Sequence, residues 1–195
     1  MDETRRRGRR KLLIVAAMFL LPVVVAFALY YGQLWRPAGS SSKGTLITPA
    51  RPLVVAGLRH VDGTPADAAV FADKWTLLYI GDGACDADCR TALVYERQSR
   101  LSLNNEMTRV QRVFLATGNC CANEYFKTEH DGMIVLDASA PGAQALLAQF
   151  PPERATSLFI VDPLGNLMMR HDGRQTTSKD LLSDLKKLLK LSHIG

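Results

Sequence analysis

The sequence predicts an α/β domain, with a central mixed sheet flanked by helices, behind one N-terminal transmembrane helix. Three observations predict this organisation: a long uncharged run near the N-terminus, apolar runs that alternate with helical stretches from about Pro52 onward, and the segment WTLLYIGDGACDADC from Trp75 to Cys89. In that segment two cysteines with three residues between them follow an apolar run and a glycine-containing turn. A chain of 195 residues has room for one such domain plus appendages.

The uncharged run from Leu12 to Tyr31 predicts the transmembrane helix, because twenty helical residues span roughly 30 Å, the thickness of a bilayer's hydrocarbon core. Six basic residues precede the run and three aromatic residues suited to the membrane interface end or follow it: Arg5, Arg6, Arg7, Arg9, Arg10 and Lys11, then Tyr30, Tyr31 and Trp35. By the positive-inside rule, residues 1–11 form a cytoplasmic tail, residues 12–31 a single-pass inner-membrane anchor, and the C-terminal domain is periplasmic. A cleaved signal peptide, with Ala26-Phe27-Ala28 as its cleavage site, or a weak twin-arginine signal is the alternative.

The formal net charge of +5 is mostly a property of the N-terminal tail. Residues 1–11 carry six of the 24 basic residues and two of the 19 acidic ones, which leaves 18 basic and 17 acidic residues for the rest of the chain. The charge is therefore a topology signal, and no nucleic-acid partner is expected.

Residues 32–51 are rich in Pro, Gly and Ser and predict a flexible linker, which leaves residues 52–195 for the folded domain. The apolar runs from Trp75 to Ile80 and from Val110 to Thr117 predict buried strands. The other expected elements are a helix from about Asp88 to Leu103, a short strand from Met133 to Leu136, a helix from Gln144 to Phe150, a hairpin of Ser157 to Val161 and Leu167 to Arg170, and a leucine-rich final helix capped by Thr177 or Ser178.

Cys85 and Cys89 are the main candidate site. If Cys85 begins a helix, Cys89 lies one turn later and the two Cα atoms are about 6 Å apart, within reach of a disulfide. The free N–H groups of a first helical turn would stabilise a thiolate on Cys85 and make it the better nucleophile. Two such thiolates can also hold Cu(I), and two ordinary half-buried cysteines are the remaining reading.

Two further cysteines, Cys120 and Cys121, follow the second predicted strand at the same sheet edge. Their adjacent Cα atoms, about 3.8 Å apart, are too close for an unstrained mutual disulfide. One of them could resolve a mixed disulfide, or the four sulfurs could form a metal cluster, but a structural or incidental role is expected. In an oxidising compartment the four cysteines should pair unless chemistry keeps them reduced.

Other polar residues near these cysteines are candidate parts of the site. Two histidines, His130 and His171, are expected to be exposed loop residues, although either could supply a metal ligand. The carboxylates of Asp82, Asp86 and Asp88 would oppose thiolate formation, and Asp88 is expected to cap the helix. The basic residues Arg90 and Arg97 would favour thiolates if they point back toward the cysteines, and His60 and His193 receive no role.

The sequences YIGDGACDADC and FIVDPLGNLMMR, with the single N-terminal anchor, resemble the Sco/SenC family of copper-centre assembly factors for cytochrome c oxidase. The stretches GTLITPARPL and Trp75 to Gly118 are similar, more narrowly, to a small group of Sco-like bacterial membrane proteins. The resemblance covers about residues 44–191 and implies a thioredoxin-like fold. The order of elements, strand, helix, strand, helix, hairpin and closing helix, is also the thioredoxin order.

The resemblance implies that Cys85 and Cys89 are the family's copper-binding cysteines, but the family's distal histidine is missing. The corresponding position falls near Arg154 or Ala155, and neither can replace a histidine ligand. The prolines that tend to follow both cysteines are also replaced here, by Asp86 and Arg90. Losing one of three ligands weakens copper binding but leaves disulfide exchange intact, so the departure favours redox chemistry.

Three functions follow from these residues. The first is a Sco-like protein that supports cytochrome c oxidase assembly by thiol–disulfide exchange through Cys85 and Cys89, with an oxidase subunit or another copper-centre assembly protein as partner. The second is a Cu(I) carrier in which Cys85 and Cys89 bind copper with an unknown third ligand. The third is a non-catalytic assembly subunit with a structural disulfide. The first would make the chain a thiol–disulfide oxidoreductase, and the second would give it copper as its cofactor.

Overall fold

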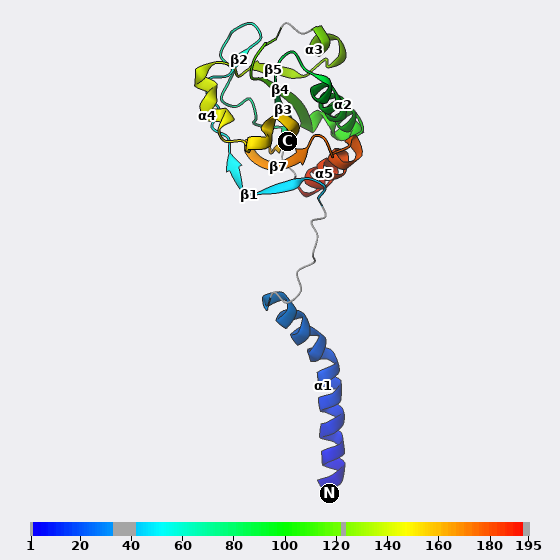
Figure 1. Ribbon diagram of the computed structural model, residues 1–195. Helices are drawn as coiled ribbons and strands as arrows, with labels where there is room; N and C mark the ends of the chain where they lie inside the picture. Colours follow the sequence, from blue (N-terminus) through cyan, green and yellow to red (C-terminus); the bar gives the residue numbers. More distant parts are fainter. Residues whose placement is uncertain (1, 33–41, 122–123, 193–195) are drawn as a thin grey trace. The chain divides into compact units, whose positions relative to one another are not determined.

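The computed structural model describes residues 2–32, 42–121 and 124–192 (Figure 1). The chain divides into two compact units, Met1–Ser40 and Ser41–Gly195. In the first unit, helix α1 (Asp2–Tyr31) contains the stretch Arg6–Tyr31, which is long and apolar enough to cross a membrane. Its apolar side chains are exposed, and its one internal proline, Pro22, is tolerated in membrane helices. By length and composition, α1 is a candidate membrane span that contains the expected anchor.

The second unit is a seven-stranded mixed sheet with helices on both faces, as the sequence predicts. The strands are β1 (Thr45–Pro52), β2 (Arg59–His60), β3 (Trp75–Gly81), β4 (Val110–Ala116), β5 (Ile134–Asp137), β6 (Ser157–Val161) and β7 (Asn166–Asp172). The helices are α2 (Ala87–Leu101), α3 (Glu124–Glu129), α4 (Gln144–Leu147) and α5 (Ser178–Leu191).

The strand order is β1-β7-β6-β3-β4-β5-β2. Strands β3, β4 and β5 are parallel, and β6 runs antiparallel to β3. Because β3 and β4 are parallel neighbours, their carboxyl ends meet at one edge of the sheet, and α2 follows β3 at that edge. The predicted hairpin is confirmed as β6 and β7 around a turn closed by Asp162.

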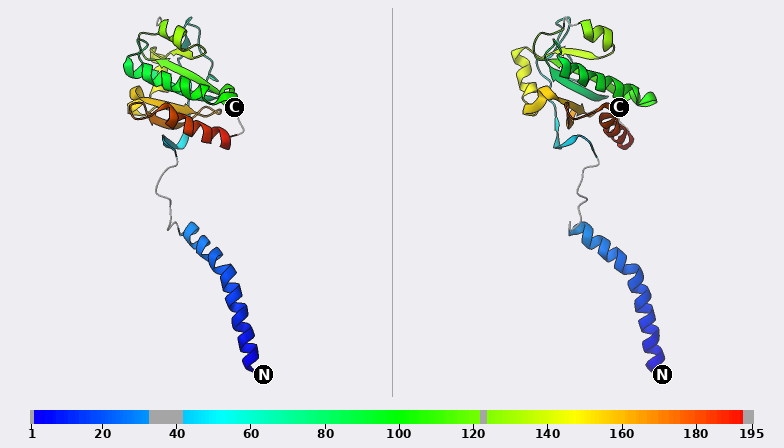
Figure 2. Two further views of the ribbon diagram at one scale, coloured as in Figure 1. Left: turned by 90° about the vertical axis from the view of Figure 1, so that its right-hand side faces the viewer. Right: turned by 45° about the vertical axis from the view of Figure 1, so that its right-hand side comes forward.

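Two buried clusters fix the sheet between its helices. One contains Trp75, Leu77 and Tyr79 of β3 and packs under α2 and α5, which lie side by side on one face (Figures 1 and 2). The other contains Leu78 and Ile80 and packs under α4. Side chains alternate between the two faces along a strand, so β3 supplies both cores.

The expected linker is wrong in its last part, because β1 occupies residues within it and pairs with β7. The loop before β1 is held by Asp184 of α5, whose Oδ2 accepts hydrogen bonds from the backbone N–H groups of Lys43 and Gly44 at 2.8 Å each. Helix α4 is shorter than predicted, and Thr177, not Ser178, caps α5 in a capping box with Asp180. Trp35, which was expected at the membrane interface, and His193 lie outside the described part of the chain.

Candidate redox site

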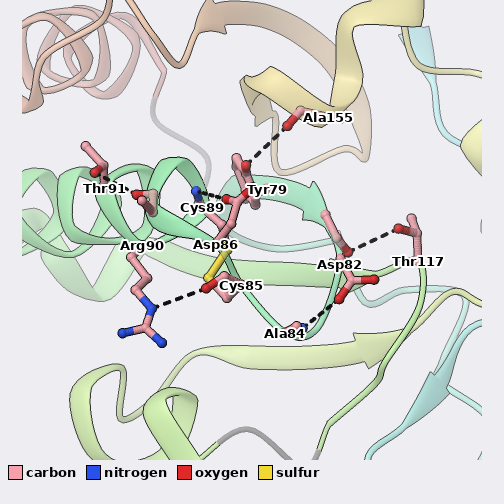
Figure 3. The surroundings of a disulfide bond; sticks show 12 residues. Tyr79, Asp82, Ala84, Cys85, Asp86, Cys89, Arg90, Thr91, Thr117 and Ala155 are labelled. Carbon is pink, nitrogen blue, oxygen red and sulfur yellow. Dashed lines mark hydrogen bonds between the residues drawn. A yellow bond between two sulfur atoms is a disulfide. The ribbon is translucent and has the colours of Figure 1, made fainter.

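The candidate site is a disulfide between Cys85 and Cys89 at the carboxyl end of β3 (Figure 3). Their Cα atoms are 5.2 Å apart, within the range for a disulfide and close to the separation expected from the sequence. Both cysteines are buried, with exposed fractions of 2% and 3%, and belong to the cluster under α2.

The structure corrects which cysteine lies in the helix. Cys85 precedes α2 and has a left-handed backbone, with φ of 50°, while Asp86 is the N-cap. The Asp86 Oδ1 atom accepts a hydrogen bond from Cys89 N at 2.9 Å. Cys89 therefore occupies the first helical turn, where the helix dipole favours negative charge on its sulfur. The expectation that this turn stabilises a thiolate on Cys85 is wrong, because Cys85 lies before the helix. The expected cap, Asp88, is instead an exposed first-turn residue with its carboxylate 3.6 Å from Arg174 Nε.

The turn before Cys85 is fastened to the loop that follows β4. Gly83 N donates to Gly118 O at 2.8 Å, and Asn119 Nδ2 donates to both carboxylate oxygens of Asp82 at 3.0 to 3.1 Å. A Cβ atom on Gly83 would collide with the carbonyl oxygen of Asn119, so only glycine fits there. The two loops form one support for the disulfide.

A cavity of about 590 Å³ opens beside the disulfide, lined by residues from β3, the start of α2, α4 and the turn before β6. Both cysteines line it, and so do Arg154 and Ala155. The residues at the position expected for the missing histidine therefore face the same space as the dithiol. Tyr79 also lines the cavity, and its hydroxyl donates to Ala155 O at 3.2 Å. Burial and nearby acidic residues raise the pKa of Tyr79 to about 12, so it stays neutral.

Arg90 points back to the disulfide turn, as one reading of the sequence required. Its Nε donates to Cys85 O at 3.2 Å (Figure 3). Its guanidinium lies 4.8 Å above the ring of Tyr125. Tyr125 packs edge-on against His130, with ring centroids 4.8 Å apart. A guanidinium held beside the turn adds positive charge where a thiolate would form.

The expectation that His130 and His171 are exposed is wrong, because both are buried. His130 Nδ1 lies 3.2 Å from Arg112 Nη1, and burial, with the Arg112 charge, lowers the pKa of His130 to about 4. His171 Nε2 lies 3.5 Å from Asp184 Oδ2, and burial lowers the pKa of His171 although Asp184 opposes this. Each histidine belongs to a separate buried contact, and neither lines the cavity beside the disulfide.

Cys120 and Cys121 are paired with each other in the structure. Both are half-buried, and Cys120 packs against the cluster that contains Cys85 and Cys89. The four cysteines thus form two neighbouring pairs and not one cluster of four.

Sequence reasoning missed Glu96, a fully buried carboxyl group on α2. Within the described residues neither of its oxygens has a hydrogen-bond partner. Burial raises the pKa of Glu96 to about 8, although the Arg112 charge opposes the shift. The sequence did contain a signal for its burial: Glu96 follows Cys89 by seven residues, which places both side chains on one face of the helix.

The donor set does not fit the copper site that the family resemblance implies. Within the described residues, no group of three or more histidine, cysteine or acidic side chains could hold a metal ion. Arg154 also lines the cavity beside the disulfide, and its cationic guanidinium cannot bind a metal.

The sequence profile described as "Transmembrane-like, thioredoxin-like, C-terminal domain" matches residues 75–192. The chain belongs to this transmembrane-like, thioredoxin-like family. A second profile, "Transmembrane-like, N-terminal domain", matches residues 2–33 and indicates membrane anchoring through α1. No curated protein matches the chain in sequence.

Solved structures show that this transmembrane-like, thioredoxin-like domain has the Sco fold, which confirms the fold predicted from the sequence. Apo Sco1 from Thermus thermophilus has a TM-score of 0.64 at 23% identity, over 77% of this chain and 99% of that one. Copper-bound yeast Sco1 has a TM-score of 0.61 at 15% identity, over 79% and 96%. BsSco, described as a cytochrome c oxidase assembly protein with a disulfide switch, has a TM-score of 0.54 at 16% identity, over 76% and 99%.

Proposed function

We propose that this protein is a membrane-anchored, Sco-like thiol–disulfide exchange protein that supports cytochrome c oxidase assembly through Cys85 and Cys89. The observation that carries the proposal is the Cys85–Cys89 disulfide, which lines an open cavity at the start of α2. Proteins of the same fold include BsSco, a cytochrome c oxidase assembly protein with a disulfide switch, and this supports the same process here. The partner would be an oxidase subunit or another copper-centre assembly protein.

The exchange uses both cysteines. The Cys85 thiolate attacks one sulfur of a partner disulfide and releases the other partner sulfur as a thiolate. The Cys89 thiolate then attacks the Cys85 sulfur, releases the second partner thiolate and leaves the Cys85–Cys89 disulfide. Two electrons pass from this protein to its partner, and no further reactant is needed. The first-turn position of Cys89 and the Arg90 guanidinium beside Cys85 support thiolate formation in the reduced state.

A trapping experiment tests this function. In a Cys89→Ser protein, expressed full length in its membrane, Cys85 can attack a partner but the mixed disulfide cannot be resolved. We expect a covalent adduct with an oxidase subunit or copper-centre assembly protein that disappears on reduction. The matched control is the Cys85→Ser, Cys89→Ser protein, and an equal yield of adducts from both variants would contradict the proposal.

We also propose the following membrane topology. Residues 1–11 are cytoplasmic, residues 12–31 form a single-pass anchor in the inner membrane, and the folded domain, which includes β1, is periplasmic. The six basic residues before the anchor support this orientation. Protease added to spheroplasts should degrade the domain, whereas protection of the domain until the membrane is lysed would reverse the topology.

A structural disulfide is the second candidate function, and the burial of both cysteines favours it. Structural disulfides have reduction potentials below about −300 mV, whereas exchange-active pairs lie higher. Equilibration of the full-length protein with glutathione and dithiothreitol buffers separates the two. A Cys85–Cys89 pair that resists reduction throughout the glutathione range would support the structural role over exchange. Copper carriage is not favoured, because Arg154 and Ala155, near which the family resemblance places the third ligand, line the cavity and neither side chain can bind copper.

A further inference from the structure

The second cysteine pair lies beside the first because of the sheet topology. Cys85 follows β3 and Cys120 follows β4, and these strands are parallel neighbours whose last residues, Gly81 and Ala116, are in register. Thr117 N then donates to Gly81 O at 2.8 Å, which continues the pairing beyond the strands. Both loops therefore leave the same edge of the sheet together.

The two loops stay in contact up to the cysteines. Gly83, two residues before Cys85, packs its backbone against the carbonyl of Asn119, the residue before Cys120. Cys120 then packs against the buried cluster that holds the first disulfide. Only Ala84 lies between Gly83 and Cys85, and Asn119 is bonded directly to Cys120, so both cysteines lie within two residues of this backbone contact.

The pairs differ in exposure. Cys85 and Cys89 are 2% and 3% exposed, whereas Cys120 and Cys121 are half-buried. Thiol–disulfide exchange requires the attacking thiolate to reach a sulfur atom, so an external thiol reaches the second pair more readily than the first.

Strained backbone is concentrated in the same two loops. Of the five non-glycine residues with positive φ in the described chain, three lie here: Cys85 at 50°, Asn119 at 44° and Cys121 at 87°. Such conformations cost of order 1 to 3 kcal/mol each and persist where surrounding structure enforces them, often at functional sites. Two of the three strained residues are cysteines, one from each pair.

We infer that Cys120 and Cys121 form a second, partner-facing redox pair that exchanges its electrons with the buried Cys85–Cys89 disulfide. This inference rests on the proposed exchange function and adds the route by which the buried pair is reduced again.

The internal step balances within the protein. The Cys120 thiolate attacks the Cys85 sulfur of the oxidised inner pair, which forms a Cys85–Cys120 bond and releases Cys89 as a thiolate. The Cys121 thiolate then attacks the Cys120 sulfur and releases Cys85 as a thiolate. The inner pair is now reduced and the outer pair oxidised by the same two electrons. An external dithiol, which is oxidised to a disulfide, reduces the outer pair and completes the cycle.

Rapid reduction kinetics test the relay on the full-length protein in detergent. Dithiothreitol is added to the oxidised protein, samples are quenched with acid and alkylating agent, and mass spectrometry follows the inner pair. In the Cys120→Ser, Cys121→Ser protein, we expect the reduction of Cys85–Cys89 to slow at least tenfold. An unchanged rate would overturn the inference, and circular dichroism checks that the variant is folded.

A cross-linking experiment tests the contact itself and does not depend on the rate. The Cys89→Ser, Cys121→Ser protein retains only Cys85 and Cys120, and it should form an intramolecular Cys85–Cys120 disulfide with oxidised glutathione. The Cys85→Ser, Cys120→Ser protein, which retains the other two cysteines, is the matched control. Equal cross-linking in the two proteins would refute the assigned attack.

The outcomes separate this inference from the proposed function. If the protein without the outer pair still traps a partner through Cys85 but is reduced at the wild-type rate, the relay is wrong and the exchange function stands. If Cys85 and Cys120 cross-link specifically but no partner is trapped, the exchange function fails and the relay stands.

Discussion

Replacing Glu96 with glutamine should make the stability of the domain less sensitive to a rise in pH from 5 to 7. Glu96 is fully buried on α2, and within the described residues its carboxylate oxygens accept no hydrogen bond. Burial raises its pKa from 4.5 to about 8, with the Arg112 charge as a smaller opposing effect. At pH 7 the folded protein therefore holds the carboxyl group protonated, while the unfolded chain has released that proton.

The pKa difference sets the size of the effect. Between pH 4.5 and 8 the folded state binds one more proton than the unfolded state, so stability falls as pH rises, by up to about 1.4 kcal/mol per pH unit. Summed from pH 5 to pH 7, the loss is about 2.5 kcal/mol. Glutamine does not titrate, so the Glu96→Gln protein should gain about that much relative to wild type over this range.

Urea unfolding of the full-length protein in detergent at pH 5, 6 and 7, followed by near-ultraviolet circular dichroism, measures the gain. Glu124→Gln is the matched control, because Glu124 is exposed on α3 and its ion pair with Lys127 is loose, at 3.9 Å. A stability difference between wild type and Glu96→Gln that stays constant with pH would refute the assignment of a protonated, buried carboxyl group.

Three further predictions concern the cap of α2 and the contact that holds the start of the domain. Asp86→Ala removes the acceptor for Cys89 N and should cost about 1 kcal/mol of unfolding free energy in urea titrations, and no loss would mean that the cap contributes nothing. Asp184→Ala leaves the N–H groups before β1 without their acceptor and should cost about 2 to 4 kcal/mol, with faster proteolysis near Gly44. The pKa of His171 is lowered in the folded state, so below about pH 6.5 the unfolded state binds more protons and acid should destabilise the domain. The His171→Asn protein should lose less stability between pH 7 and pH 5 in urea titrations than the wild type does.

The elements predicted correctly from sequence are those whose burial is visible in a local run. Trp75 to Ile80 and Val110 to Thr117 are apolar along their length because both faces of a central strand are covered, and the structure confirms them as β3 and β4. The turn Asp162 to Asn166 predicted the hairpin for a similarly local reason, since the Asp162 side chain bonds the backbone within the turn itself.

The errors occur where structure depends on distant residues. Strand β1 is an edge strand with mostly exposed side chains and two prolines, so nothing in its own sequence distinguishes it from a linker. It becomes a strand because β7 offers an unpaired edge more than a hundred residues away. His171 lies on β7, and Gly44, just before β1, and Asp184 of α5 lie against its ring, which local polarity cannot reveal.

The charged residues of the candidate site could be identified from the sequence, but their interaction partners could not. These residues include the three carboxylates around the dithiol. Asp82 joins the two loops through Asn119, Asp86 caps α2, and Asp88 lies near Arg174. Each carboxylate therefore has a cationic or N–H partner, which weakens the opposition to a thiolate that the sequence predicted.

Arg154 bears on the choice between the proposed exchange function and copper carriage. It lines the cavity beside the disulfide, in the region where the family resemblance places a histidine ligand. A guanidinium repels Cu(I) and offers it no lone pair, whereas it attracts a thiolate. Near the position of the missing histidine, Arg154 therefore adds positive charge to the cavity beside the disulfide. With Arg90 held at the Cys85 carbonyl and Cys89 in the first turn of α2, these positive groups support the proposed exchange function, because each stabilises a thiolate.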